Sequence, residues 1–111
     1  MTKSFIDTVF IIYDSKTKAL LLITNDEKLQ LKTLRTLILN DMNNEKTDLE
    51  MKILKTDDKE EAQILKMTVV QLEQQENNKN LRSYILNDKV VNRYYLYSKE
   101  LNNTDTKIFF N

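Results

Sequence analysis

The chain has neither glycine nor proline among its 111 residues, and this constrains every turn that the fold can contain. Glycine adopts positive φ without strain, and proline fixes φ at many turns. Turns in this chain must therefore be built from Asn, Asp, Ser or Lys, of which Asn tolerates the left-handed region best. The absence of glycine also excludes phosphate-binding loops, dinucleotide-binding turns and the nucleophile elbow of hydrolases.

Histidine and cysteine are absent as well. The chain therefore lacks the commonest general base, the commonest thiol nucleophile and the ligands of nearly every structural zinc site. The serines have no histidine partner and no glycine-shaped turn, which excludes the usual serine hydrolases. We expect no catalytic residue, no metal ligand set and no cofactor, and we predict that the protein is not an enzyme.

Alanine and arginine, whose codons are GC-rich like those of glycine and proline, are scarce, while Lys, Asn and Ile are abundant. This bias is typical of an AT-rich genome. We expect the chain to come from a virus, a mobile element or a low-GC bacterium.

Length and composition are typical of one compact domain that covers residues 1–111. Apolar residues make up 41% of the chain and charged residues 31%, a balance typical of globular proteins. Lys plus Arg and Asp plus Glu each number 17, so no net charge would attract nucleic acid or an anionic membrane. The longest apolar run, Ala19–Ile23, is too short to span a bilayer, and we expect a cytoplasmic protein without a membrane partner.

The first part of the chain predicts a β-hairpin. Phe5–Tyr13 and Ala19–Thr24 are β-branched, aromatic or leucine-rich, and Asp14–Lys18 separates them as a turn. Both strands carry apolar residues on both alternating faces. We therefore expect them to lie centrally in a sheet, covered by the chain on both sides, or on one side by the chain and on the other by a partner.

This opening, FIDTVFIIYDSKTKALLLIT, resembles the first hairpin of Nudix hydrolases. Nudix activity depends on a loop and helix rich in Gly and Glu. The corresponding stretch here, EKLQLKTLRTLILND, has neither the glycines nor the paired acidic residues. The resemblance is therefore limited to the hairpin and implies no activity.

The middle of the chain predicts a helix, a strand and a second helix. Asn25 or Asp26 can cap a helix that ends in the polar stretch 40–44 and carries on one stripe Leu31, Leu34, Ile38 and Met42. The stretch 48–54, DLEMKIL, alternates apolar and charged residues as a half-exposed strand does. Asp58 and Glu61 form a capping box before another helical pattern.

The last part predicts a second hairpin. Residues 59–87 fit one helix or two, with Asn80 as a cap for a short helix containing Leu81 and Ile85. The β-type runs 90–98 and 106–110 follow, separated by a loop over 101–105. The predicted order is β-β-α-β-α-(α)-β-β, an α+β fold with a single mixed or antiparallel sheet of about five strands flanked by two or three helices.

The C-terminal hairpin also carries the candidate binding residues. Strand alternation places its cations and aromatics on one face, while Tyr94 and Leu96 point to the core. Such a face is typical of an ordinary exposed sheet surface, and the zero net charge favours this interpretation over a nucleic-acid site. As a binding surface it suits a protein partner, because Tyr and Arg are enriched at interfaces, or a nucleic acid, through base stacking and phosphate contacts. The predicted binding residues are Arg93, Tyr95, Tyr97, Lys99 and Lys107.

An acidic cluster offers a third chemistry. The acidic residues Asp57, Asp58, Glu60 and Glu61 could join Asp7 or Asp14 to hold Mg²⁺ for phosphodiester hydrolysis. Acidic residues in a first helical turn also complement the positive end of the helix, and this simpler interpretation is favoured.

By elimination, we expect a small non-enzymatic protein that binds another protein or a second copy of itself, as an accessory subunit or an inhibitor. The two-sided apolar strands support this, because a partner or a dimer would cover one face. Nucleic-acid binding through the C-terminal hairpin is the first alternative. The carboxylate–Mg²⁺ phosphodiesterase is the second.

Overall fold

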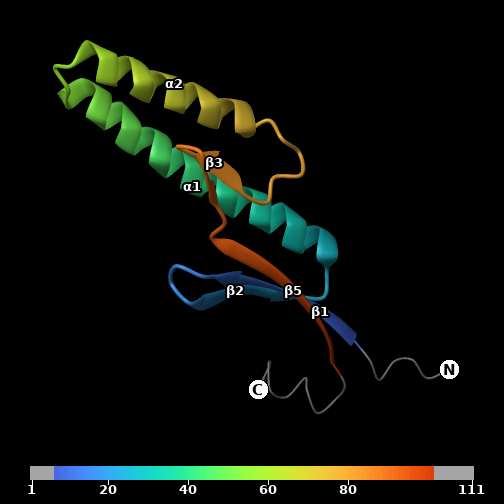
Figure 1. Cartoon of the computed structure of the whole chain (residues 1–111). Helices are drawn as coiled ribbons and strands as arrows, with labels where there is room; N and C mark the ends of the chain where they lie inside the picture. The colour runs from blue at the N-terminus through green and yellow to red at the C-terminus, as the bar shows by residue number, and fades with distance from the viewer. Residues whose placement is uncertain (1–6, 102–111) are drawn as a thin grey trace. The chain divides into compact units, whose positions relative to one another are not determined.

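The structure, a computed structural model, describes residues 7–101. Contacts group these residues into two compact units, here called the sheet unit (7–33 and 93–101) and the helical unit (34–92). The elements in chain order are β1 (Asp7–Asp14), β2 (Ala19–Thr24), α1 (Glu27–Lys55), α2 (Lys59–Gln75), β3 (Tyr84–Leu86), β4 (Lys89–Val91) and β5 (Tyr94–Leu101) (Figure 1). Helix α1 runs from the first unit into the second.

The sheet unit is built on a three-stranded antiparallel sheet in the order β2-β1-β5. The predicted N-terminal hairpin is confirmed, with Ile11 of β1 opposite Ile23 of β2. Strand β1 is central, as expected, but β2 lies at an edge of the described sheet, so its expected central position is wrong. The other neighbour of β1 is β5, in which Tyr97 lies opposite Ile11.

The turn between β1 and β2 shows how the chain manages without glycine. Asp14 Oδ1 accepts hydrogen bonds from the backbone N–H groups of Lys16 and Thr17, at 2.9 and 3.4 Å. The N–H of Lys18 donates to the Asp14 carbonyl at 2.7 Å. Lys18 itself has a φ of 60°, a conformation that glycine adopts more easily. The side chain of Asp14 thus organises a turn that closes on a left-handed lysine.

Both helices begin at an N-terminal cap that the sequence predicts. Asp26 Oδ1 accepts from the N–H groups of Lys28 and Leu29 and caps α1. Asp58 Oδ1 accepts from the N–H groups of Glu60 and Glu61 and caps α2. Both N-caps are confirmed, because a short carboxylate satisfies N–H groups that have no partner within the helix. The predicted return contact of the capping box is not made, because the Asp58 N–H donates to Thr56 Oγ1 at 3.2 Å.

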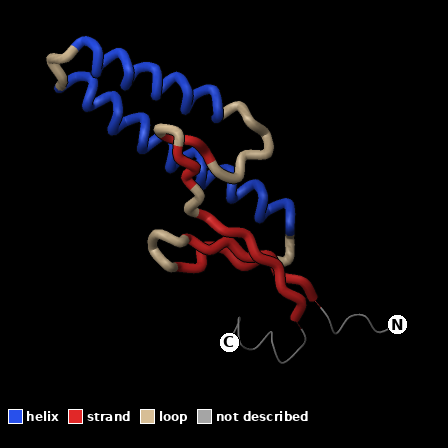
Figure 2. Tube along the Cα trace, viewed as in Figure 1, coloured by secondary structure: helices blue, strands red, loops and turns tan. Residues whose placement is uncertain are grey.

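The predicted strand over 48–54 is wrong, because these residues continue α1 (Figure 2). The expected end of the helix in 40–44 is wrong for the same reason. The buried residues Leu34, Ile38, Met42 and Leu49 follow a helical repeat across that stretch, and no Gly or Pro interrupts it. A six-residue alternation is a weaker pattern than a stripe of apolar residues four turns long.

The short helix expected around Leu81 and Ile85 is also wrong, because β3 and β4 form a two-stranded hairpin there. Its turn residues, Asn87 and Asp88, both have positive φ, at 53° and 63°, as a tight hairpin turn requires. The side chain of Gln75 acts as a third strand partner. Its Nε2 donates to the Ile85 carbonyl at 2.8 Å, and its Oε1 accepts from the Ile85 N–H at 2.6 Å.

The run 90–98 was predicted as one strand, but it is divided between the two sheets. Val90 and Val91 belong to β4, which pairs with β3, whereas Tyr94 begins β5, which pairs with β1. The second predicted strand, 106–110, lies outside the described residues. The fold is α+β with the order β-β-α-α-β-β-β, and its strands form two sheets where one was expected.

Among residues 7–101, neither helix has the length and apolar character needed to cross a membrane.

Candidate functional site

The candidate site is a patch on one face of the three-stranded sheet. Tyr95 lies opposite Tyr13, which lies opposite Leu20 of β2. Residues opposite one another in an antiparallel sheet share a face, and the next row on that face contains Tyr97, Ile11 and Ile23. We call Tyr13, Leu20, Tyr95 and Tyr97 the outer sheet patch.

The outer sheet patch is exposed although it is apolar and aromatic. Leu20 is 54% exposed, Tyr97 53% and Tyr95 39%. Further along the same face, Val9, Ile11 and Leu101 are buried in a small core cluster against which Ile23 packs. The patch is therefore the exposed continuation of a packed core, held on paired strands. The opposite face of the sheet contributes Ile12, Asp14 and Tyr94, which are all buried.

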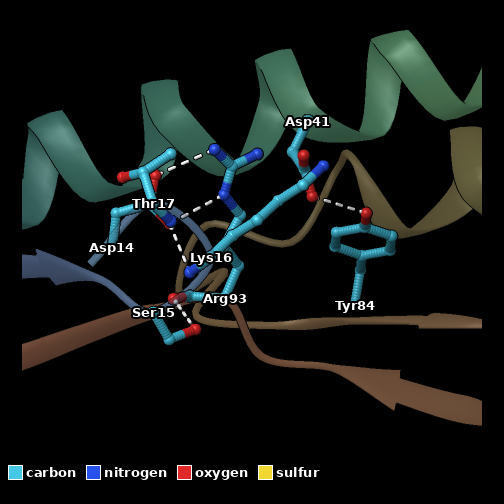
Figure 3. A network of polar contacts seen from close by, with 7 residues as sticks. All are labelled: Asp14, Ser15, Lys16, Thr17, Asp41, Tyr84 and Arg93. Atoms are coloured by element: carbon cyan, nitrogen blue, oxygen red, sulfur yellow. Dashed lines mark hydrogen bonds and ion pairs between the residues drawn. The ribbon is translucent and has the colours of Figure 1, made fainter. Parts of the chain in front are cut away.

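Arg93 does not belong to this patch. It precedes β5, and its Nε and Nη2 atoms donate to Oδ1 and Oδ2 of Asp14 at 2.9 and 2.8 Å (Figure 3). The guanidinium carbon also lies 5.0 Å from the centre of the Tyr94 ring. The Arg93 hydrogen bonds hold the pKa of the Asp14 carboxyl well below its usual range, against the opposing effect of burial.

The backbone of Arg93 is bound at the same place. Its carbonyl accepts from the Ser15 hydroxyl at 2.7 Å and from the Ser15 N–H at 2.9 Å. Asp14 is only 2% exposed, so its charge needs a partner of opposite charge. Arg93 therefore balances a buried carboxylate and fixes the start of β5.

The remaining predicted residues fall in different places. The structure brings Tyr95, Tyr97 and Lys99 together on one face of β5, with Lys99 opposite Val9 and exposed. Lys107 lies outside the described residues. Of the three predicted cations, only Lys99 is placed on this face. The described part of this face, within residues 7–101, is therefore poor in phosphate-binding groups.

Sequence reasoning missed a second surface, on the helical unit. A cavity of about 440 Å³ lies between the C-terminal half of α1 and the middle of α2. It is lined by Ile53, Leu54, Val69 and Val70, with Glu50 and Lys66 at its margin. Leu54 is 86% exposed. This surface was missed because residues 48–54 were predicted as a strand. The sequence feature that could have indicated it is the presence of apolar residues, such as Val70, on the exposed face of the second predicted helix.

Two residues of the acidic cluster, Asp58 and Glu61, make hydrogen bonds with residues close to them in the sequence. Asp58 caps α2, and Glu61 Oε2 accepts from the Thr56 hydroxyl at 3.2 Å. Within residues 7–101, no three acidic side chains converge as a metal site would require. The carboxylate–Mg²⁺ alternative therefore gains no support from this part of the chain.

No match to this chain was found among protein-family models, curated proteins or solved structures. The function is therefore argued from the geometry alone.

Proposed function

We propose that this protein is a non-enzymatic protein-binding module, an accessory subunit or an inhibitor, and that the outer sheet patch contacts its partner. The observation that carries this proposal is the exposure of two tyrosines and a leucine in adjacent rows of one sheet face. Tyrosine supplies a large contact area with few rotatable bonds and a hydroxyl that can hydrogen-bond at the edge of an interface. Paired strands hold these side chains with little freedom to lose on binding.

The electrostatics favour a protein partner over a nucleic acid. The chain has no net charge, and Arg93 is occupied by Asp14. A nucleic-acid site needs several cations that neutralise phosphates, and affinity then falls steeply with salt. Among residues 7–101, Lys99 lies on the same face of β5 as the patch tyrosines. The proposal keeps the expected cytoplasmic location, which stays a prediction.

The test is a comparison of two double variants in affinity capture from a lysate of the native host. The patch variant is Tyr95→Ser with Tyr97→Ser. The control is Ile85→Ser with Val90→Ser, which removes apolar groups of similar exposure, 53% and 67%, from the β3–β4 hairpin. Circular dichroism verifies that both variants fold.

We expect a stoichiometric protein that is retained by the wild type and the control, lost with the patch variant, and unaffected by nuclease. Retention by the patch variant would refute the outer sheet patch as the binding surface. Recovery that disappears with nuclease would instead support the nucleic-acid alternative.

A further inference from the structure

Helix α2 has a buried face and an opposite, exposed face, and on each the residues recur at helical spacing. One face contributes the buried residues Thr68 and Leu72. The opposite face carries Gln63, Met67, Val70 and Gln74, spaced four, three and four residues apart. This is the spacing of a coiled-coil seam. We call these four residues the α2 seam.

The α2 seam is uncharged and open to solvent. Met67 is 56% exposed and Val70 is 49% exposed. The seam residues line a shallow groove of about 350 Å³, together with Lys66 and Gln71. Solvated outer faces of helices usually carry charged residues, so an uncharged stripe with exposed apolar residues at its centre is typical of a contact surface.

We propose that the α2 seam packs antiparallel against the same seam of a second copy of this chain. The sequence of the seam is complementary to itself in that direction. A twofold axis midway along the seam places Met67 against Val70 of the second copy, and Gln63 against Gln74 of the second copy. Each apolar residue then meets an apolar residue, and each amide meets an amide that can hydrogen-bond to it.

The charges beside the seam favour the same direction. Lys66 and Glu73 lie seven residues apart, so both flank the same side of the seam. Antiparallel packing brings Lys66 within about 3 Å, along the helix axis, of Glu73 in the second copy, because each residue rises about 1.5 Å. The twofold axis makes this ion pair twice. Parallel packing would place Lys66 beside the uncharged Gln71 instead.

The size of the seam sets the expected strength. Helix α2 has 17 residues and is therefore about 25 Å long, with a width of about 10 Å. A contact of this width falls in the class below about 1,200 Å², which is typical of weak and transient complexes. We expect a monomer–dimer equilibrium with a Kd on the order of 0.1–1 mM.

The first test is sedimentation equilibrium over a concentration series, at low and high salt. Met67→Lys should weaken the dimer at least tenfold, because it places two lysines in the centre of the seam. The exposed Lys52→Glu on α1 and the double variant Tyr95→Ser with Tyr97→Ser are controls that should dimerise like the wild type. A protein that is monomeric at about 1 mM, or a dimer that survives Met67→Lys, would overturn the proposal.

The second test reads the direction of packing by cross-linking, for which the absence of native cysteine is an advantage. Gln63→Cys and Gln74→Cys variants are prepared separately, mixed and treated with a short thiol-reactive cross-linker. Antiparallel packing predicts a product that joins one chain of each variant, with little product from either variant alone. Products from each variant alone would show parallel packing and refute the proposed arrangement.

This inference concerns a surface other than the outer sheet patch, so each can fail separately. The double tyrosine variant removes the patch and leaves the seam. Met67→Lys removes the seam and leaves the patch.

Discussion

The sheet unit and the helical unit use polar groups in different ways. In the sheet unit, one buried ion pair, Asp14 with Arg93, joins residues 79 positions apart. In the helical unit, several partly exposed side chains bind backbone atoms, as when Arg35 donates to the carbonyls of Glu76 and Asn78 at 2.9 and 2.7 Å. The sheet unit thus relies on polar side chains that are themselves buried, Asp14 and Gln30, and Gln30 Nε2 donates to the carbonyls of Ile11 and Tyr97 at 2.9 and 3.1 Å. The helical unit relies on polar side chains that are partly exposed.

The largest expected effect is therefore in the sheet unit. Arg93→Ala should lower the free energy of unfolding by about 3–5 kcal/mol, because it leaves the buried Asp14 carboxylate without an opposite charge. In the helical unit, Gln75→Ala should lower it by only about 1 kcal/mol, because its hydrogen bonds to Ile85 are exposed to water. Urea denaturation of both variants measures the difference.

Arg93→Lys is the matched control for this pair. Lysine keeps the charge but cannot donate the two hydrogen bonds that Nε and Nη2 make to the carboxylate. We expect its loss of stability to lie between the wild type and Arg93→Ala. Equal losses for Arg93→Ala and Gln75→Ala would show that the two units do not differ in the way described.

The next largest expected effect is a difference between the two units in how their stability depends on pH. The pKa of Asp14 is lowered from its ordinary value of 3.8, first by the hydrogen bonds from Arg93. A lowered pKa in the folded state means stability that is present above the ordinary value and is lost as pH falls below it. The pKa of Lys46 is raised above 10.5, chiefly by its hydrogen bond with Glu76, which lies at 2.8 Å. A raised pKa means stability that is present below 10.5 and is lost as pH rises above it.

The measurement is the free energy of unfolding from pH 2 to pH 11, in about one-unit steps, for the wild type and two variants. Asp14→Asn should flatten the acid limb and leave the alkaline limb unchanged. Lys46→Met should do the reverse. An acid limb that keeps its slope in Asp14→Asn would assign acid sensitivity to other carboxylates.

The parts of the fold that could be predicted are those that depend on contacts between residues close together in the sequence. The two helix caps and the first hairpin were correct, because Asp26, Asp58 and the turn after Asp14 act within a few residues. The strand assigned to 48–54 was wrong, because the helical stripe that includes Met42 continues to Leu49 and overrides the six-residue alternation. Local patterns succeed where local contacts decide the structure.

The same distinction between local and distant contacts explains which residues of the candidate site were predicted correctly. Strand alternation predicted that Tyr95 and Tyr97 share one face. They do so in the structure, because a paired strand keeps this alternation. The same alternation included Arg93, whose side chain is instead decided by Asp14, 79 residues away. Nothing within a few residues of Arg93 indicates a buried carboxylate. The cavity between α1 and α2 was missed because residues 48–54, which line part of it, were predicted as a strand and not as a helix.

The smallest expected effects concern the turns, and they compare the two units at the same kind of position. Lys18 in the sheet unit and Asn87 in the helical unit both have positive φ. A long side chain in this region costs about 1 kcal/mol relative to glycine, whereas Asn is better tolerated there. Lys18→Gly should therefore raise the free energy of unfolding by about 0.5–1 kcal/mol, and Asn87→Gly by less than about 0.5 kcal/mol.

Lys16→Gly provides the control within the same turn, because Lys16 does not have a positive φ. There glycine only increases the freedom of the unfolded chain, and we expect stability to fall by about 0.5–1 kcal/mol. Urea midpoints of the three variants give the comparison. A gain for Lys18→Gly with a loss for Lys16→Gly would locate the strain at the left-handed residue. A loss for both would mean that the lysine at position 18 is unstrained, and that this chain makes its turns without glycine at no measurable cost.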